Sequence, residues 1–510
     1  ALENSIYKIT LDTKGDIVSL FDKKNSAFCY LYDSIVAQIA AGRFPYGASL
    51  PSASQLCGIY QVGLRTVRDV MPVLQRDGYI RTQERRRPVV VYRPAAPLSG
   101  TNFVRTLLER RSSISADFEA MAVLMPPLLR FCAEQYTDEE LHAYATASRR
   151  VRKAFHADVI ESWRLSSSIL NSILSKSGNP LFRDLYASLE LFTQFSASGE
   201  QVHPFQRAKE IEAAQPFHWV LAPLLQRDHP EDERRLQLMY RIIGSYADEY
   251  LARLSAEYPD APVPLAGAYH WDATRGRGFL YGEVAHDLTA KLSAGLWEDG
   301  AFLPDAAELA AQYGVSLYTV RRALSLLEGR GMVRVCNGQG TQVTLSQIAR
   351  NPCCFSDPAQ RRDAMAYLQA CHLMVLLLPT AAALAFDRLS ISDRDRLSRQ
   401  LSEQSAAVMS SLLECVIAAL PSDVLRTIFY ELSKLLLWGS YFAMYPAAGD
   451  SIPILERHCR LALDLWGCGD RAGFADQLTG FYLYRFRHTQ EFLLLEGLQE
   501  AGILSSPPSG

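Results

Sequence analysis

The sequence lacks several features that mark whole classes of protein. Its ten cysteines are scattered with no CxxC pair, so we expect reduced thiols rather than a disulfide framework or a zinc site. Lysine plus arginine (52) and aspartate plus glutamate (55) nearly balance at a net charge of -3, so any nucleic-acid surface must be a local patch. There is no nucleophile-base constellation, phosphate loop or metal-ligand spacing. We therefore expect no enzyme activity, no cofactor and no metal.

Long hydrophobic runs are also scarce. The most apolar stretch, CHLMVLLLPTAAALAF at 371–386, is shorter than the roughly 18 to 20 residues that span a bilayer, and it contains His372 and Pro379. We expect a buried helix of a bundle there. The printed sequence does not open on a signal peptide, so we expect a cytoplasmic protein with no membrane partner.

What the sequence does contain is an internal repeat. Residues 42–80 align without a gap to residues 295–333, at an offset of 253, so that Thr66-Val67-Arg68 in LRTVRDV matches Thr319-Val320-Arg321 in LYTVRRA. Farther along, 168–186 aligns to 411–429 at an offset of 243, as small loop insertions would produce. The chain is therefore interpreted as a tandem duplication of a unit of about 240 residues.

Each unit begins with a short block and continues with a long helical region. The stretches SASQ (52–55) and DAAE (305–308) are predicted capping boxes at helix starts. Residues 79–92 and 332–345 each predict two short strands around a tip. Linkers rich in proline and glycine are expected at 93–100 and 258–278. The predicted domains are 28–93, 101–258, 279–346 and 353–500.

Residues 1–27 stand outside the duplication. Apolar and polar residues alternate around TKGD, which predicts a β-hairpin. The segment resembles part of the β-sandwich of family 38 glycoside hydrolases (alpha-mannosidases), but it carries no catalytic residue. We interpret it as a fusion scar or gene-model artefact, without glycosidase activity.

The short blocks resemble the GntR family of bacterial transcription regulators. The resemblance rests on LPDAAELAAQYGVSLYTVRRALSLLEGRGMVRVCNGQGT (303–341) and on the matching helices of the first unit. The helical regions resemble the ligand-binding domain of the FadR-type subgroup, through SGNPLF (177–182) and HCRLALDLWGCGDRAGFA (458–475). The implied fold class is mainly α, with two winged helix-turn-helix domains of three helices and a two-stranded wing. They alternate with two all-α bundles that bind a ligand.

The resemblance implies a DNA-contacting surface on each winged helix. Its candidate residues are Ser52, Ser54, Leu64, Arg65, Thr66, Arg68, Arg85, Arg86 and Arg87 in the first unit, and Leu317, Tyr318, Thr319, Arg321, Arg322, Gly338, Gln339 and Gly340 in the second.

Two arginines of the subgroup are missing from each unit. A base-reading arginine is replaced by Leu64 and Leu317, and another, in the second helix, by Ser54 and Ala307. Leucine can contact a thymine methyl but cannot bind guanine through two hydrogen bonds, so the preferred DNA sequence should differ from the family's usual one.

The two predicted DNA-binding surfaces differ in charge. Residues 31–93 hold nine arginines and four acids, whereas residues 280–345 hold five basic residues and seven acids, so we expect the first unit to bind the DNA backbone more strongly. QERRRP (83–88) is either a DNA-contacting wing or a solvated tip. Arg68 and Arg321 either contact DNA or pair with a neighbouring carboxylate such as Asp69 or Glu328.

In many members of the subgroup, an Asp and three His residues of the helical domain hold a metal. The corresponding positions here are Ser166 and Leu170 in the first unit and Leu413 in the second, and only His218 and His458 have the expected type. Each histidine can have a satisfied structural role, contact an organic effector or, least in keeping with its apolar companions, bind a metal.

These features lead to a functional hypothesis and an alternative. The hypothesis is a single-chain pseudo-dimer in which two non-identical winged helices read the two half-sites of double-stranded DNA, under control of an unidentified small molecule in the bundles. Further self-association is compatible with it. The alternative is a sensor or protein-interaction protein whose winged helices have lost sequence-specific DNA binding.

Overall fold

The computed structural model describes most of the chain and has the predicted fold class. The described residues are 27–40, 44, 46–60, 62–82, 86–92, 108, 111–157, 159–193, 216–259, 269–274, 279–293, 296–345, 355, 357–403, 405–439 and 452–507. Helices dominate, and the strands form two separate two-stranded sheets. The hairpin predicted at 1–27 lies outside the described residues except for Ala27, as does the linker at 93–100.

The first winged helix is called head 1. Its elements are α1 (Ala27–Ala40), α2 (Ala53–Tyr60), α3 (Leu64–Arg76), β1 (Ile80–Arg81) and β2 (Val89–Val90). The predicted capping box is confirmed at the start of α2, where the Ser52 backbone N–H donates to Gln55 Oε1 and the Gln55 N–H donates to Ser52 Oγ. The strands pair antiparallel, with Ile80 opposite Val90, and form the predicted wing.

The second winged helix, head 2, repeats this order. Its elements are α12 (Leu280–Ser293), α13 (Ala306–Tyr313), α14 (Leu317–Gly329), β3 (Val333–Cys336) and β4 (Gly340–Val343). Asp305 caps α13 by accepting from the N–H groups of Ala307 and Glu308. In the described part of the chain Glu308 makes no return bond to Asp305, so only half of this capping box forms. The helix starts of the two heads keep the offset of 253 residues.

Each head is followed by a helical bundle. Bundle 1 contains α5 (Arg111–Glu134), α6 (Asp138–Ala157), α7 (Val159–Leu174), η2 (Ser175–Ser177), α8 (Pro180–Thr193), α10 (Phe217–Gln226) and α11 (His229–Glu257). Bundle 2 contains α15 (Pro358–Ala385), η5 (Phe386–Arg388), α16 (Ile391–Glu403), α17 (Ser405–Ala419), α18 (Asp423–Trp438), α19 (Ile452–Cys468), α20 (Arg471–Leu495) and η8 (Gln499–Ile503). The long pairs α5 with α11 and α15 with α20 pack most extensively, which repeats the same scaffold in both bundles.

The apolar run 371–386 forms the second half of α15 and the start of η5, and much of it is buried, including Cys371, His372 and Leu373. By length and composition alone, the segment Pro358–Arg388 would suffice to cross a membrane. However, 67% of its most apolar window is buried inside the protein, as in the core helix of a bundle.

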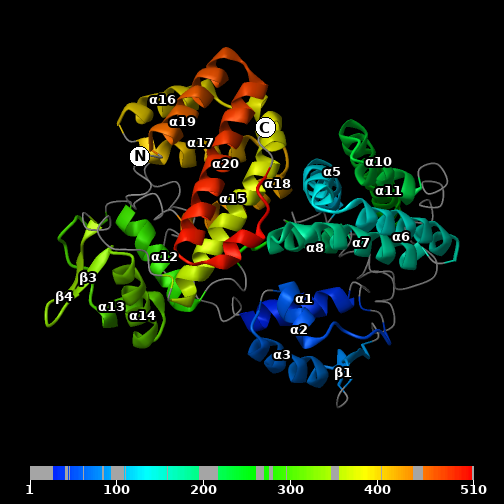
Figure 1. Ribbon diagram of the computed structural model, residues 1–510, viewed down its shortest axis with the longest axis horizontal. Coiled ribbons are helices and arrows are strands. Elements are labelled where there is room, and N and C mark those ends of the chain that lie inside the picture. Colours follow the sequence, from blue (N-terminus) through cyan, green and yellow to red (C-terminus); the bar gives the residue numbers. More distant parts are fainter. Residues whose placement is uncertain are drawn as a thin grey trace.

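The two bundles contact each other through α5, α8, α15 and α18. His372 on α15 lies at this contact, between the rings of Phe131, Phe182 and Phe486. The Asn179 side chain donates to the Gln369 carbonyl at 2.9 Å across the same contact. In Figure 1 both heads lie below the bundles, with head 2 under bundle 2 and head 1 under bundle 1.

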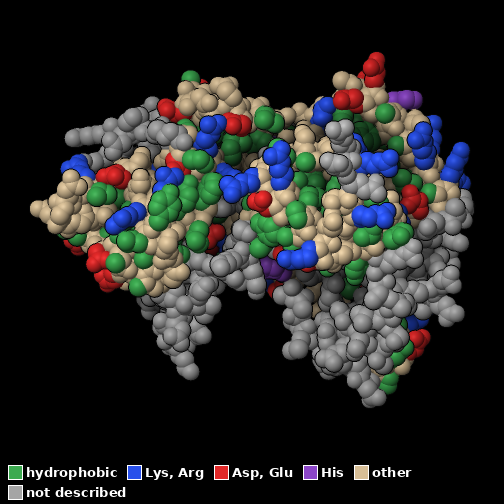
Figure 2. Space-filling view, turned by 90° about the horizontal axis from the view of Figure 1, so that it is seen from below, with side chains coloured by type: hydrophobic (Ala, Val, Ile, Leu, Met, Phe, Trp, Pro, Cys, Tyr) green, Lys and Arg blue, Asp and Glu red, His purple; other side chains and the backbone are tan. Residues whose placement is uncertain are grey.

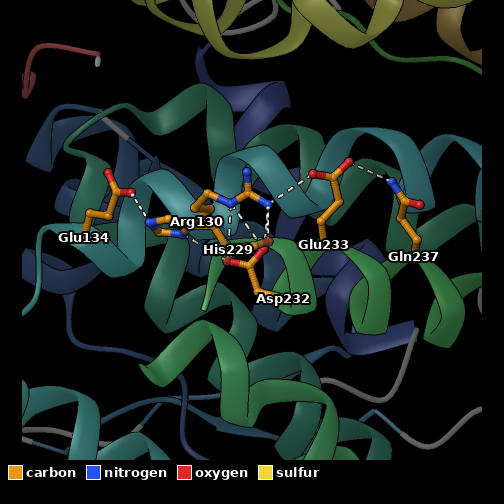
Figure 3. A network of polar contacts seen from close by, with 6 residues as sticks. All are labelled: Arg130, Glu134, His229, Asp232, Glu233 and Gln237. Atoms are coloured by element: carbon orange, nitrogen blue, oxygen red, sulfur yellow. Dashed lines mark hydrogen bonds and ion pairs between the residues drawn. The ribbon is translucent and has the colours of Figure 1, made fainter. Parts of the chain in front are cut away.

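Bundle 1 contains a polar network that joins its two longest helices. Arg130 on α5 binds Asp232 on α11 at 2.7 Å and Glu233 at 3.1 Å, and His229 reaches Glu134 (Figure 3). Asp232 is fully buried. Because these ion pairs link the first turn of α11 to α5, we interpret the network as stabilising the bundle.

The described core falls into two clusters. One cluster contains head 2 and both bundles, and the other contains head 1 alone, from Leu31 to Val90. Head 2 is therefore continuous with the bundles through buried apolar side chains, whereas head 1 has a core of its own.

Candidate nucleic-acid interface

The helix α3 is amphipathic and presents a polar side to solvent. Val67, Val70 and Leu74 are buried in the head 1 core. On the opposite side Arg65 and Arg68 are exposed, and Leu64 is 44% exposed despite being apolar. An exposed leucine in the first turn, one turn before an exposed arginine, suits a surface that enters a DNA groove.

The helix α14 presents the equivalent surface in head 2. Val320 and Ala323 are buried, while Leu317 is 38% and Tyr318 74% exposed. Arg321 is exposed one turn after Leu317. Ser316 caps the helix by accepting from the Thr319 N–H at 3.1 Å, whereas Gly63 at the matching position of head 1 gives no side-chain cap.

Arg68 and Arg321 have no ion-pair partner among the residues that the structure describes. The neighbouring carboxylates considered for them have other contacts: Asp69 lies 3.9 Å from Arg65, and Glu328 accepts from the Val335 N–H. Both guanidinium groups are therefore available to an external anion.

The hydroxyl residues of the predicted surface differ in their availability. Ser52 is used in the capping box of α2, and Thr319 shares a hydrogen bond with Ser316. Thr66 is half-buried, whereas Ser54 is exposed on α2.

Two glycines lie at the turn between the strands of the head 2 wing. Gly338 has φ 76° and Gly340 φ 112°, backbone conformations that favour glycine. The Gln339 N–H donates to the Cys336 carbonyl and closes the turn, and all residues from Arg334 to Gly340 except Cys336 are exposed. In head 1, Arg86 and Arg87 are exposed beside β2, and Arg85 lies outside the described residues. Figure 2 shows the molecule from below, where basic and acidic side chains are interspersed with hydrophobic ones over the described part of this face.

Arg322 differs from the other candidates because it binds within the protein. Its guanidinium pairs with Asp357, the N-cap of α15, at 2.8 Å and lies over the ring of Tyr281 at 5.0 Å. The prediction that Arg322 contacts DNA did not consider this partner, which lies 35 residues later in the sequence. In this structure Arg322 joins head 2 to bundle 2.

A second, buried ion pair joins the same two parts and was not predicted. Arg330, which follows α14 as its C-cap, binds Asp363 on α15, and His286 on α12 binds the same carboxylate at 2.7 Å. Arg330 and Asp363 are almost fully buried, and the His286 ring stacks on Trp438. The pairs Arg322–Asp357 and Arg330–Asp363, together with His286, are called the head 2 latch.

Head 1 has different residues at the latch positions. At the offset of 253, Asp69 stands where head 2 has Arg322, Asp77 where it has Arg330, and Asp33 where it has His286. Asp77 binds Tyr32 and Arg76 within head 1, and the two hydrogen bonds hold the pKa of its carboxyl below the usual range. Head 1 instead reaches α8 of bundle 1.

Two polar interactions of that contact lie among the described residues. Tyr30 donates to Asp184 at 3.1 Å, and Arg183 donates to the Ile59 carbonyl at 2.7 Å. Neither pair is fully buried. The contact between head 1 and bundle 1 is thus more open to solvent than the Arg330–Asp363 pair of head 2.

Ion pairs also neutralise part of the basic charge of head 2. Lys291 binds Asp287 at 2.6 Å, and Arg322 and Arg330 are paired with bundle 2. In head 1, by contrast, Arg65, Arg68, Arg86 and Arg87 are all exposed. The sequence-based charge difference between the heads therefore becomes larger at the surface.

The two histidines considered for an effector have unlike surroundings. Burial, with Arg152 and Arg149 nearby, lowers the pKa of His218, whose Nδ1 is buried without a described partner. His458 Nδ1 lies 3.0 Å from Gln477 Oε1, and its ring packs directly against Gly480. Within the described residues, no three His, Cys, Asp or Glu side chains form a group that could hold a metal ion. The effector role of both histidines stays a prediction.

Comparisons with known proteins identify the heads. The model of the family of bacterial regulatory proteins called gntR matches residues 30–90 and 280–343. The chain is similar to the HTH-type transcriptional regulator TreR of Bacillus subtilis (strain 168), with 39% identity over 60 residues, which are 12% of this chain and 25% of TreR. It is similar to the HTH-type transcriptional repressor NanR of Cronobacter sakazakii, with 28% identity over 163 residues, which are 31% of this chain and 61% of NanR.

A further relative is the uncharacterized HTH-type transcriptional regulator RB1450 of Rhizobium meliloti (strain 1021), with 34% identity over 64 residues, 12% of this chain and 26% of the relative. These alignments span less than two thirds of each relative. Among solved structures, Streptococcus agalactiae GntR has 18% identity and a TM-score of 0.19, and covers 41% of this chain and 99% of its own. The Listeria monocytogenes protein Lar has 15% identity and a TM-score of 0.20, and covers 42% of this chain and 97% of its own.

The two family matches coincide with the two heads seen in the structure. They also agree with the tandem duplication derived from the repeated sequence. The gntR family model therefore matches both copies of the duplicated head, at residues 30–90 and 280–343.

Proposed function

We propose that the protein is a cytoplasmic transcription regulator that binds double-stranded DNA through both heads. The observation that carries this proposal is the exposed arginine after Thr-Val in each head, Arg68 and Arg321, which have no ion-pair partner among the described residues. A guanidinium on a protruding helix can bind phosphate or the edge of a guanine. The regulator names of the relatives are consistent with this function.

The two heads would act as a pair within one chain. Regulators of this type pair two winged helices about a two-fold axis, and here the contact of α5 with α15 and α18 supplies a pairing of the two units. Leu64 and Arg65 of head 1 correspond in the repeat to Leu317 and Tyr318 of head 2. Because arginine and tyrosine would contact different bases, the two half-sites should differ in sequence. The bundles resemble the ligand-binding domain of the FadR-type subgroup. A small-molecule effector bound in them would change the relative position of the heads and so the affinity for DNA.

The DNA-binding proposal is tested with the full chain and fragmented genomic DNA at several salt concentrations. The double variant Arg68→Ala, Arg321→Ala should bind more weakly and with a shallower salt dependence, by about 0.9 per lost phosphate contact. Arg234→Ala, an exposed arginine of bundle 1 paired with Glu231, serves as the matched control. Equally weak, salt-insensitive binding by the wild type and the double variant would refute the proposal.

The pseudo-dimer is tested separately by light scattering after gel filtration. One chain has a mass of 56.9 kDa, and we expect that mass in solution because the pairing is internal. A stable dimer or tetramer of the chain would contradict the monomeric form of the proposal.

A second function is favoured by one observation on head 2. Three of its basic residues, Lys291, Arg322 and Arg330, are paired with carboxylates, and Tyr318 is 74% exposed on the recognition helix. Head 2 would then bind a protein instead of DNA. DNA binding that depends on Arg68 but is unchanged by Arg321→Ala would support this alternative for head 2.

A further inference from the structure

Bundle 2 contains an arginine whose charge has no counter-ion in the described structure. Arg485 on α20 donates from Nε to the Tyr367 hydroxyl of α15 at 2.6 Å, and its guanidinium carbon lies 5.5 Å from the Tyr367 ring centre. Its other neighbours are Cys371 and Tyr482. No carboxylate among the described residues pairs with it.

This arrangement costs free energy unless something compensates the charge. Tyr367 and Tyr482 are almost fully buried, and the guanidinium is only partly open to solvent. A guanidinium removed from water loses hydration that one neutral hydroxyl replaces poorly. A protein interior normally supplies a carboxylate at such a place. Here the described residues offer only phenol and thiol groups.

Bundle 1 shows that the fold does not need this arginine. The helices α11 and α20 begin after Asp228 and Asp470, which places Ile243 of α11 at the position of Arg485. The repeat offset of 253 in α5 and α15 places Ile114 at the position of Tyr367. Ile114 is buried and Ile243 packs against the same core. Two isoleucines therefore fill in bundle 1 the positions that hold tyrosine and arginine in bundle 2.

The tyrosine is also held firmly in place. Gly439, which follows α18, lies so close to the Tyr367 ring that an added Cβ would come within 2.1 Å of it. Because the ring cannot shift toward α18, the hydroxyl keeps a defined position beside the guanidinium. A fixed hydrogen-bond partner orients the planar face of Arg485 before any ligand arrives.

We propose that Arg485, oriented by Tyr367, binds the oxyanion group of a small molecule in bundle 2. Guanidinium groups bind carboxylate and phosphate through paired, charge-assisted hydrogen bonds, and such a group would supply the counter-charge that the described residues do not provide. This inference rests on the proposed function, in which a bundle binds an effector, and it names the chemical class of that effector. Since bundle 1 has isoleucines instead, each chain holds one such site.

The site lies next to the contact that holds head 2. Tyr367 is one helical turn after Asp363 on α15, and Asp363 binds Arg330 at the end of the recognition helix α14. An anion that draws Arg485 toward itself would change the contact of Arg485 with the Tyr367 hydroxyl, and so would act on this part of α15. The ligand would thereby act on head 2 through contiguous, packed residues.

The test measures thermal stability and binding heat of the full chain with a panel of probes. The panel contains acetate, lactate, succinate and citrate as carboxylates, inorganic phosphate and glycerol 3-phosphate as phosphates, and succinamide as an uncharged control. We expect at least one oxyanion to raise the melting temperature and to bind on the order of tenfold or more weakly to Arg485→Ile. The carboxylate and phosphate arms identify the source of the oxyanion.

The variant is chosen to fold, because bundle 1 carries isoleucine at the same position. Without ligand, Arg485→Ile should be at least as stable as the wild type, since it removes an uncompensated charge. The double variant Tyr367→Ile, Arg485→Ile reproduces the bundle 1 pair and provides a second folded reference. Arg487→Ala, an exposed arginine two residues later on α20, should bind the oxyanion as the wild type does.

Two results would overturn the inference: stabilisation by none of the oxyanions, or an equal response in the wild type and Arg485→Ile. The proposed function is assessed independently by DNA binding of the same proteins without ligand. Retained DNA binding with no oxyanion response removes only the inference. An oxyanion response that depends on Arg485, in a chain that binds no DNA, removes only the DNA-binding proposal.

Discussion

Asp363 of bundle 2 and Arg330 of head 2 form a buried ion pair, 2.5 Å apart, with both side chains at most 2% exposed. The pair fixes the C-terminal end of α14 to α15, and His286 binds the same carboxylate. Head 1 has Asp77 where head 2 has Arg330, and it contacts bundle 1 through α8 instead. The two heads are thus attached to their bundles in different ways, so they need not respond equally to a change in the bundles.

Asp363→Ala is expected to lower the free energy of unfolding by about 3–5 kcal/mol, because it leaves the buried Arg330 without its carboxylate. The measurement is chemical denaturation of the full chain. Asp387→Ala, which removes the exposed partner of Arg471, is the control and should cost at most about 1 kcal/mol. An equal loss of unfolding free energy in the two variants would mean that the Arg330–Asp363 pair contributes no more stability than an exposed ion pair.

Arg86→Ala with Arg87→Ala should weaken DNA binding and lower the salt slope by roughly two, since each arginine that neutralises a phosphate contributes about 0.9. The measurement is fluorescence anisotropy of labelled DNA over a range of salt concentrations. Arg361→Ala, whose side chain pairs with Glu500 away from both wings, is the control. An unchanged slope in the double variant would place the two arginines on a solvated tip.

Because of buried His372, we expect the protein to lose stability in acid. Burial lowers the pKa of this histidine from 6.5 to about 3, so the unfolded chain takes up the proton first as the pH falls. The stability that the neutral ring contributes is complete above pH 6.5 and declines as the pH falls toward 3. In His372→Phe, whose ring joins three phenylalanines, unfolding should depend less on pH in this window. Identical acid limbs for wild type and variant would contradict this assignment.

Because of Glu283 on α12, we expect a contribution to stability that changes with pH in the opposite direction. Burial, reinforced by the charge of Asp272, raises the pKa of its carboxyl from 4.5 to about 7. The contribution of the protonated group is complete below pH 4.5 and is lost as the pH rises through about 7. Glu283→Gln should therefore gain stability over the wild type between pH 5 and 8, by about 1–3 kcal/mol at most because the group is partly solvated. Thermal unfolding at several pH values measures the difference, and a constant difference across the range would be inconsistent with the raised pKa.

Gly338→Ala tests the wing of head 2. Its φ of 76° is costly for a residue with a Cβ, although no atom within 4 Å would clash, so we expect a loss of about 1–2 kcal/mol from backbone strain alone. Gly58→Ala, in the ordinary helical backbone of α2, where an added Cβ would likewise meet no atom within 4 Å, should instead be neutral or stabilising. Chemical denaturation compares the two, and a stabilising Gly338→Ala would show that the wing changes conformation at little cost.

Much of the fold could be predicted from local sequence patterns. The period of apolar residues in α3 and α14, the Ser52 to Gln55 capping box and the turns of the wings all depend on residues a few positions apart. The repeat offset of 253 residues assigned the helices and strands predicted in one head to the other. The family matches at 30–90 and 280–343 agree with this offset.

The candidate interface was predicted less completely. The exposure of Leu64, Arg68, Leu317 and Arg321 followed from their places on an amphipathic helix. Arg322 could not be separated from them by sequence, because only its contact with Asp357 shows that it joins head 2 to bundle 2. The charge difference between the heads was visible as a count, but which charges remain available depended on ion pairs across the fold.

The sequence by itself determined the duplication, the helices and wings of each head, and the residues that each recognition helix exposes, because these follow from periodicity and capping within short segments. Only the tertiary structure decided that Arg330 is buried against Asp363, that His372 lies between the bundles, and that Arg485 meets Tyr367 with no carboxylate of the described residues beside it. These contacts join residues on different helices, 33 residues apart for Arg330 and Asp363 and 118 apart for Arg485 and Tyr367. Their energies depend on burial, which no local pattern specifies.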